Sequence, residues 1–130
     1  MTVVDVDGST NTNVGQSSSL CSGGVLCAKG MFDGVDDTRW HCNKAGPCSF
    51  ELDLGEERIL HSVYANSIEN RMGVLTFETK LEESDQYQAY ETLTSGAEYS
   101  GNSLHVLFQS IRIARYVKVT VDTAPNTGDF

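Results

Sequence analysis

Short segments in which apolar and polar residues alternate are the feature that most constrains the fold of this chain. The segments 49–54, 74–81 and 111–121 each alternate in this way, and runs rich in Ser, Gly and Asn separate them. A period of two places successive side chains on opposite faces of a β-strand, so each segment predicts a strand with one buried and one wet face. Several such strands in one chain predict an all-β domain, an antiparallel β-sandwich or jelly roll.

The alternation also predicts which side chains face the core. The residues expected to point inward are Phe50, Leu52, Leu54, Leu75, Phe77, Leu81, Ile111, Ile113, Val117, Val119 and Val121. Arg115 interrupts the third segment, and we expect it to pair with an acidic residue. His61 and His105 fall within predicted strands, where we expect a structural role.

Length and charge restrict the classes of partner. The 130 residues suit a single domain spanning 1–130, and 18 acidic against 9 basic residues give a net charge of −9. An acidic surface repels phosphate backbones and anionic lipids, which argues against nucleic-acid and membrane partners. No apolar run approaches the roughly 20 residues that a membrane-spanning helix needs.

Four cysteines form two groups with equal spacing, Cys21 with Cys27 and Cys42 with Cys48. The spacing favours two local disulfides, although four cysteines allow three pairings and the sequence does not choose among them. A zinc site that includes His41 is the alternative, but structural zinc sites favour closer cysteines. Disulfides are typical of oxidising compartments, so we expect the domain to be secreted or on a cell surface.

The segment 28–40 combines two glycines, three carboxylates, a Thr hydroxyl and the only Trp of the chain. Calcium takes about six to eight oxygen ligands, and main-chain carbonyls count among them. We therefore predict a structural Ca²⁺ site, and its expected ligands are Asp33, Asp36, Thr38 and a carbonyl of Gly30 or Lys29. The alternative is that these acids only form local Asx turns.

The same segment, written Ala-x-x-x-Phe-Asp-Gly-x-x-Asp-Thr-x-Trp, resembles the opening motif of the discoidin, or coagulation-factor type C, domain family. The sequence Ala-Arg-Tyr-Val-Lys-Val at 114–119 is similar to a strand of that family, and Asp-Leu-Gly at 53–55 matches the end of another. The resemblance covers about residues 14–123 and is closest in character to the family-32 carbohydrate-binding modules. It implies a galactose-binding-like β-sandwich, preceded here by an extra segment, 1–13.

The resemblance also implies a sugar site. His41 directly follows the Trp, and Arg71 follows a predicted strand, as the two main sugar contacts do in sugar-binding relatives. Asn70 and Glu69 are expected to add hydrogen bonds, and Tyr99, Tyr64 or Phe108 to stack on the sugar. Relatives often carry an aromatic residue where this chain has Lys44, which argues against simple galactose specificity. The alternative is that His41 is a surface residue beside a disulfide and Arg71 a solvated loop charge.

One departure from the family concerns the end of the sandwich sequence. Family members carry a last strand with a Glu that completes the calcium shell, and this chain ends at 127–130 without one. The segment 3–7 alternates like a strand and carries Asp5 and Asp7. We expect this segment to take the vacated sheet position, with one of the two acids in place of the Glu; truncation of the sequence is the alternative.

No arrangement typical of a catalytic site occurs in the sequence. The acids cluster in one turn or scatter over polar faces, whereas glycoside hydrolysis needs two carboxylates about 5 to 10 Å apart in a cleft. The sequence therefore predicts a non-catalytic, calcium-stabilised carbohydrate-binding module, part of a larger multidomain protein. The alternative is a protein-binding adhesion or interaction domain of the discoidin type, with a cell-surface protein as partner.

Overall fold

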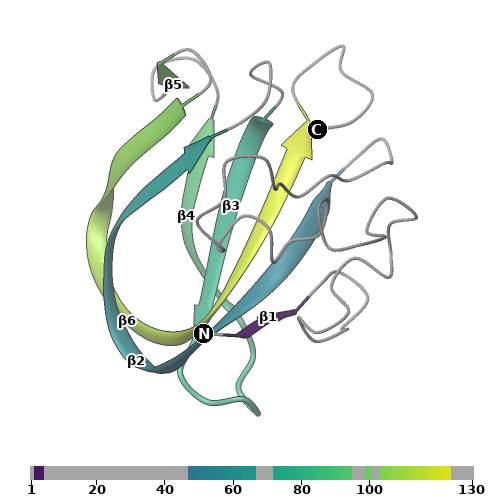
Figure 1. Cartoon of the computed structure of the whole chain (residues 1–130). Helices are drawn as coiled ribbons and strands as arrows, with labels where there is room; N and C mark the ends of the chain where they lie inside the picture. The colour runs from purple at the N-terminus through teal and green to yellow at the C-terminus, as the bar shows by residue number, and fades with distance from the viewer. Residues whose placement is uncertain (1, 5–46, 67–71, 95–98, 101–102, 124–130) are drawn as a thin grey trace.

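Our computed structural model describes residues 2–4, 47–66, 72–94, 99–100 and 103–123. In these residues the chain forms strands and no helix (Figure 1). The strands are β1 (Thr2–Val4), β2 (Cys48–Asn66), β3 (Met72–Lys80), β4 (Gln88–Thr94), β5 (Tyr99–Ser100) and β6 (Ser103–Thr123).

All pairings between the described strands are antiparallel, and they form one continuous sheet. The strand order is β1-β2-β6-β3-β4, with β5 added to β6. β2 and β6 are much longer than the other strands, and they pair from Cys48 opposite Val121 to Asn66 opposite Ser103. This long two-stranded ribbon therefore lies at the centre of the sheet, with β1 added to β2 and with β3 and β5 added to β6.

The ribbon bends in the middle, so the sheet folds over on itself (Figure 1). The register between β2 and β6 shifts twice, between Asp53 and Arg58 and between Leu60 and Ser62. Such irregularities add residues to one strand and make it bend. Gly55 lies in the first of them with a φ of 86°, a left-handed conformation that glycine adopts without steric cost.

The bend creates two layers. The broad layer contains β1, β3, β4 and the ribbon segments 48–53 and 116–123, and the narrow layer contains β5 and the ribbon segments 58–66 and 103–114. The core lies between the two layers. Its buried residues are Cys48, Phe50, Leu75, Phe77, Leu93, Val117, Val119 and Val121, and the partly buried residues against them include Leu60, Val63, Ala65 and Phe108 of the narrow layer.

Hydrogen bonds and aromatic contacts join the two layers. The Tyr90 hydroxyl on β4 donates to the main-chain oxygens of Leu60 (3.0 Å) and Ser110 (2.6 Å), both in the narrow layer. The ring of Phe108 on β6 lies edge-on to Phe77 of β3, with 5.2 Å between ring centroids. This arrangement confirms the predicted antiparallel β-sandwich.

Most of the predicted inward positions are correct, but three are wrong. Ile111 and Ile113 are 73% and 54% exposed, whereas Val117, Val119 and Val121 are buried. The alternation is reversed at the bend, because Ala114 points inward and two residues, Arg115 and Tyr116, precede the next buried side chain. Leu81 is 42% exposed because β3 ends one residue earlier, at Lys80.

The N-terminal segment forms an edge strand over Thr2–Val4, antiparallel to β2. Asp5 and Asp7 lie outside the described residues, so the replacement of the family's last strand and of its Glu stays a prediction. Arg115 pairs with an acid as predicted, and the partner is Asp53 of β2, with Nε 2.9 Å from Oδ1.

Candidate ligand-binding site

In the sequence, the predicted sugar contacts fall before or between described strands. His41 and Lys44 precede β2, and Glu69, Asn70 and Arg71 connect β2 to β3; all five lie outside the described residues. The main chain of Tyr99 is described, and it pairs with Leu104 in β5–β6. The structure therefore tests none of these side chains directly.

The strand ends that flank these residues come together at one end of the sandwich, which we call the upper end as it is drawn in Figure 1. β2 ends and β6 begins there, as Asn66 pairs with Ser103. β3 begins there opposite the end of β6, and β4 ends there opposite Val74. The start of β2 at Cys48 pairs with Val121 near the same end. The fold thus brings the points of attachment of sequence-distant segments to one end.

Of the three aromatic residues considered for stacking on a sugar, the structure describes the side chains of two, Phe108 and Tyr64, and their environments differ. Phe108 is packed inside the sandwich, with its ring 5.2 Å from that of Phe77 and 4.8 Å from that of Tyr90. This packing in the core argues against Phe108 as the stacking residue. Tyr64 is 64% exposed and stands two residues before the end of β2, near the upper end.

The remaining predictions fall largely outside the described residues. Asp33, Asp36, Thr38, Gly30 and Lys29 are not among them, so the Ca²⁺ site stays a prediction. The described residues contain no group of three His, Cys, Asp or Glu side chains able to hold a metal ion.

The cysteine pairing is also untested. Cys48 is buried at the start of β2 and is disulfide-bonded. Cys21, Cys27 and Cys42 lie outside the described residues, so the proposed pairs stay predictions.

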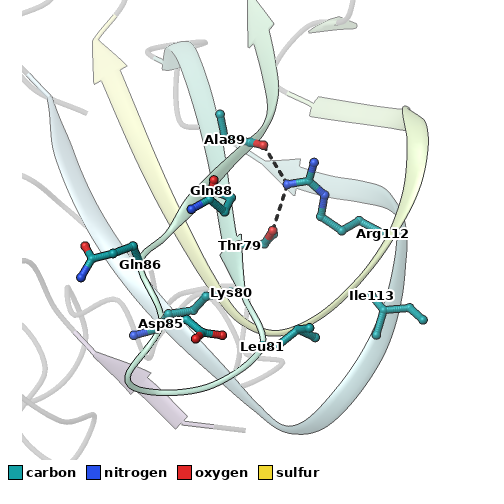
Figure 2. A pocket seen from close by; sticks show the side chains of 9 residues that line it. All are labelled: Thr79, Lys80, Leu81, Asp85, Gln86, Gln88, Ala89, Arg112 and Ile113. Atoms are coloured by element: carbon teal, nitrogen blue, oxygen red, sulfur yellow. Dashed lines mark hydrogen bonds between the residues drawn. The ribbon is translucent and has the colours of Figure 1, made fainter.

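A cavity opens at the opposite, lower end of the sandwich, which the sequence did not indicate (Figure 2). Its volume is about 590 Å³, and it lies where the connection between β3 and β4 meets β6 near the bend. The lining residues are Thr79, Lys80, Leu81, Asp85, Gln86, Gln88, Ala89, Arg112 and Ile113.

Arg112 organises this cavity. One guanidinium nitrogen donates to the Thr79 hydroxyl (3.2 Å) and to the Ala89 carbonyl (2.7 Å), as the dashed lines in Figure 2 show. The guanidinium carbon lies 4.7 Å from the centre of the Tyr90 ring. Sequence reasoning missed Arg112 because it placed the neighbouring isoleucines inward. A cationic residue between two isoleucines was the only available signal.

Comparison with known proteins finds similar folds among solved structures but no match in sequence. No protein-family model matches the sequence, and no curated protein matches it in sequence. Among solved structures, chitosan-binding module 1 from a chitosanase/glucanase of Paenibacillus sp. IK-5 is similar over 82% of this chain and 80% of its own, with 24% identity and a TM-score of 0.65.

Two further structures are similar. The CBM32 of AlyQ, in complex with 4,5-unsaturated mannuronic acid, matches over 80% of this chain and 79% of its own, with 19% identity and a TM-score of 0.64. The Clostridium perfringens module CpGH89CBM32-5, in complex with GalNAc-β-1,3-galactose, matches over 84% and 81%, with 17% identity and a TM-score of 0.66. The chain has the galactose-binding-like fold of family-32 carbohydrate-binding modules. The structures it matches over most of their length are binding modules and not catalytic domains.

On this galactose-binding-like sandwich, the outer face of the narrow layer carries several exposed apolar side chains. Ile59 and Ile113 are cross-strand neighbours on it, and both are more than half exposed. Tyr64, Leu107 and Ile111 extend the same face. We call these five residues the apolar face. Separately, none of the described residues forms a helix long and apolar enough to cross a membrane.

Proposed function

We propose that this chain is a non-catalytic carbohydrate-binding module that binds glycans through the loops at the upper end of the sandwich. The observation that carries the proposal is the convergence of strand ends at Asn66, Met72 and Thr94, on a fold shared with modules solved in complex with sugars. The proposed contacts Glu69, Asn70 and Arg71 follow Asn66 and precede Met72 in the sequence. Fold alone does not determine function, so the proposal rests on these residues as well.

The chemistry of the proposed site suits sugar hydroxyls. His41, Arg71, Asn70 and Glu69 supply planar donors and acceptors, and a hydroxyl that loses water without gaining such a partner is costly. Tyr99 is proposed to stack on the apolar side of the sugar ring. The exposed Tyr64 is a second candidate, since it lies close to the same end.

A structural Ca²⁺ ion is proposed to order the loop 28–40, on which His41 depends for its position. Asp33, Asp36, Thr38 and a carbonyl of Gly30 or Lys29 are the proposed oxygen ligands. The ion contributes no chemistry to a bound sugar in this scheme. When bound, it cross-links segments of the chain and so stabilises the folded state.

The proposed biological role is tethering. A single shallow site gives weak binding, but a module attached to other domains raises their effective concentration at a glycan-rich surface. We therefore propose a secreted or cell-surface location, with a glycan or glycoconjugate as the partner. The net charge of −9 favours a neutral glycan over a polyanionic one.

The test is a glycan-array screen in calcium-containing buffer, followed by titration calorimetry with the best ligand. His41→Ala and Arg71→Ala are each expected to weaken binding at least tenfold without lowering the melting temperature. His61→Ala and Arg58→Ala are matched controls, because both residues are exposed on described strands away from the upper end. Full binding by both site variants would refute the assignment of the site, and a blank array would count against a glycan ligand.

The apolar face favours a second candidate function, protein binding. Its five large side chains are 54–73% exposed, and an exposed patch of several such residues is typical of a protein-interaction surface. Binding to cultured cells before and after enzymatic removal of surface glycans separates the two functions. Binding that survives glycan removal and is lost in a Leu107→Ser, Ile111→Ser variant would support protein binding. Binding lost with the glycans and kept by the variant would support the carbohydrate-binding module.

A further inference from the structure

The cavity at the lower end has the dimensions of a small-molecule site. Its volume of about 590 Å³ falls within the range of roughly 300–1,000 Å³ that small-ligand pockets occupy. Its walls come from the end of β3, the connection between β3 and β4, the start of β4, and β6 near the bend (Figure 2). The cavity therefore lies at the opposite end of the sandwich from the proposed glycan loops.

The polar groups of the cavity are held in place and have hydrogen-bonding capacity to spare. Arg112 is fixed by its bonds to Thr79 and Ala89 and by the Tyr90 ring, yet it forms no ion pair with a described carboxylate. Its second terminal nitrogen and its Nε donate to no described residue. A guanidinium ordered before binding loses little conformational entropy when a ligand arrives.

Gln88 supplies a second planar group. It pairs in register with Thr79, and directly opposite residues of an antiparallel pair project to the same side of the sheet. Gln88 therefore lies on the side of β4 that Arg112 approaches. Its side-chain amide forms no hydrogen bond with a described residue, so its two N–H donors and its carbonyl acceptor are open to a ligand.

An aliphatic surface accompanies these polar groups. Leu81 lines the same cavity, is 42% exposed and is not part of the buried core. Ile113 also borders the cavity, but it alternates with Arg112 along β6 and belongs to the apolar face. Planar hydrogen-bonding groups beside an aliphatic surface match a molecule with hydroxyls on its rim and C–H groups on one face.

The charges of the cavity favour a neutral ligand. The Lys80 ammonium is engaged elsewhere, since it donates to the Glu83 carbonyl (2.6 Å) and lies over the rings of Tyr87 and Tyr116. This leaves the Arg112 cation and the Asp85 carboxylate, which accepts from the Glu82 amide. The two charges offset each other, and the net charge of −9 repels anions from the molecule as a whole.

From this geometry we propose that the lower-end cavity is a second ligand site that binds a neutral pyranose sugar through Arg112 and Gln88, with Leu81 against the C–H face of the ring. The assignment of a sugar as the ligand rests on the proposed function, whereas the location of the site rests on the cavity itself. Two sites at opposite ends would let one module bridge two glycan chains. Bivalent attachment of this kind raises avidity without any new contact.

The experiment is a nuclear magnetic resonance titration of the full ¹⁵N-labelled chain with methyl β-D-galactopyranoside and with N-acetyl-D-glucosamine. Binding at the cavity is expected to shift the amide signals of Gln88, Ala89 and Arg112, and to do so equally in a His41→Ala variant. Gln88→Leu is expected to weaken these shifts at least tenfold in apparent affinity. Gln109→Leu is the matched control, because Gln109 is an exposed β6 residue that does not line the cavity.

The outcomes separate this proposal from the proposed function. Shifts confined to residues around 41 and 67–71 would refute the second site and leave the proposed function standing. Shifts confined to the lower end would support the second site and refute the loop assignment. D-glucuronate is titrated as well, and stronger binding than either neutral sugar would overturn the neutral-ligand assignment. Retention of full affinity by Gln88→Leu would overturn the role of that residue.

Discussion

Asp53 and Arg115 form a two-bond ion pair at the bend of the long ribbon, with Nε 2.9 Å from Oδ1 and Nη2 3.0 Å from Oδ2. Asp53 Oδ1 also accepts a hydrogen bond from the Gly55 amide at 2.8 Å. One carboxylate therefore holds both the first irregularity of β2 and the neighbouring segment of β6. This pair fixes the place where the sheet passes from the broad layer to the narrow layer.

The ion pair predicts a specific acid sensitivity. The hydrogen bonds from Arg115 hold the pKa of Asp53 below its ordinary value of 3.8. A lowered pKa contributes stability that is fully present above about pH 3.8 and is lost as the pH falls through the lower folded-state value. We expect Asp53→Asn to lower the free energy of unfolding at pH 7 and to flatten its decline below pH 4, as measured by urea denaturation across a pH series.

Glu56→Gln is the control for that experiment. Glu56 pairs with Arg58 at 2.7 Å, but both side chains are more than half exposed. Exposed pairs contribute only about 0–1 kcal/mol, so this variant is expected to change the unfolding free energy little. Equal losses in the two variants would show that the Asp53 pair has no special role at the bend.

Two tyrosines give a matched comparison of a satisfied and an unsatisfied hydroxyl. The Tyr90 hydroxyl bridges the layers, whereas the buried Tyr87 hydroxyl has no hydrogen-bond partner among the described residues. Tyr90→Phe is expected to destabilise by about 1–3 kcal/mol, because it leaves carbonyl groups unpaired. Tyr87→Phe is expected to be neutral or stabilising. Chemical denaturation of both variants measures the difference, and the opposite ranking would contradict the layer contact.

The same tyrosines predict loss of stability in alkali. Burial raises the pKa of Tyr87 and of Tyr90 above the ordinary value of 10.0, and the negative charges of Glu51 and Glu78 add to the effect at Tyr87. A raised tyrosine pKa contributes stability below about pH 10 that is lost at higher pH, because the unfolded state ionises first. We expect melting temperature to fall above pH 10, and to fall less steeply in Tyr87→Phe.

The interlayer aromatic cluster predicts a large packing effect. Phe108 contacts both Phe77 and Tyr90 from the narrow layer. Phe108→Ala removes the ring and leaves a cavity between the layers, which typically costs about 3–5 kcal/mol. Ile111→Ala, three residues away on the exposed face, is expected to change stability by no more than about 0.5 kcal/mol. Thermal unfolding of the two variants tests whether the layers pack as described.

The proposed calcium site predicts a stabilising effect of the ion. A ligand that binds only the folded state stabilises it by about 2.7 kcal/mol at one hundred times its dissociation constant. Removal of Ca²⁺ with a chelator is therefore expected to lower the melting temperature of the wild type, and Asp33→Asn is expected to abolish the calcium dependence. A melting temperature that does not respond to calcium would remove the ion from the proposal.

The sequence predicted the strands better than the faces of those strands. Phe50, Leu75 and Phe77 are buried as expected, since alternation within a straight strand depends only on neighbouring residues. Ile111 and Ile113 are exposed because the bend between Ala114 and Val117 reverses the alternation, and a shift of one residue moves every side chain to the other face. The position of that bend depends on pairing with β2, which is distant in sequence.

The two candidate sites also differ in whether local sequence could reveal them. His41 and Arg71 could be proposed from the sequence, because each is recognised from its immediate neighbours in the chain. The lower-end cavity has no motif, because Thr79, Gln88 and Arg112 meet only after three strands pair and the ribbon bends. Its Arg112 was hidden by the incorrect assignment of the neighbouring isoleucines to the core.

By itself the sequence determined the all-β class and the main strands, because the period of alternation is a local property of the chain. It also determined that Arg115 requires an acidic partner, because a cation beside a core is costly when unpaired. The tertiary structure alone decided that this partner is Asp53, that the sheet folds into two layers, and that one face of the narrow layer remains apolar and exposed. These features depend on the register between β2 and β6, which long-range pairing sets and no single segment encodes.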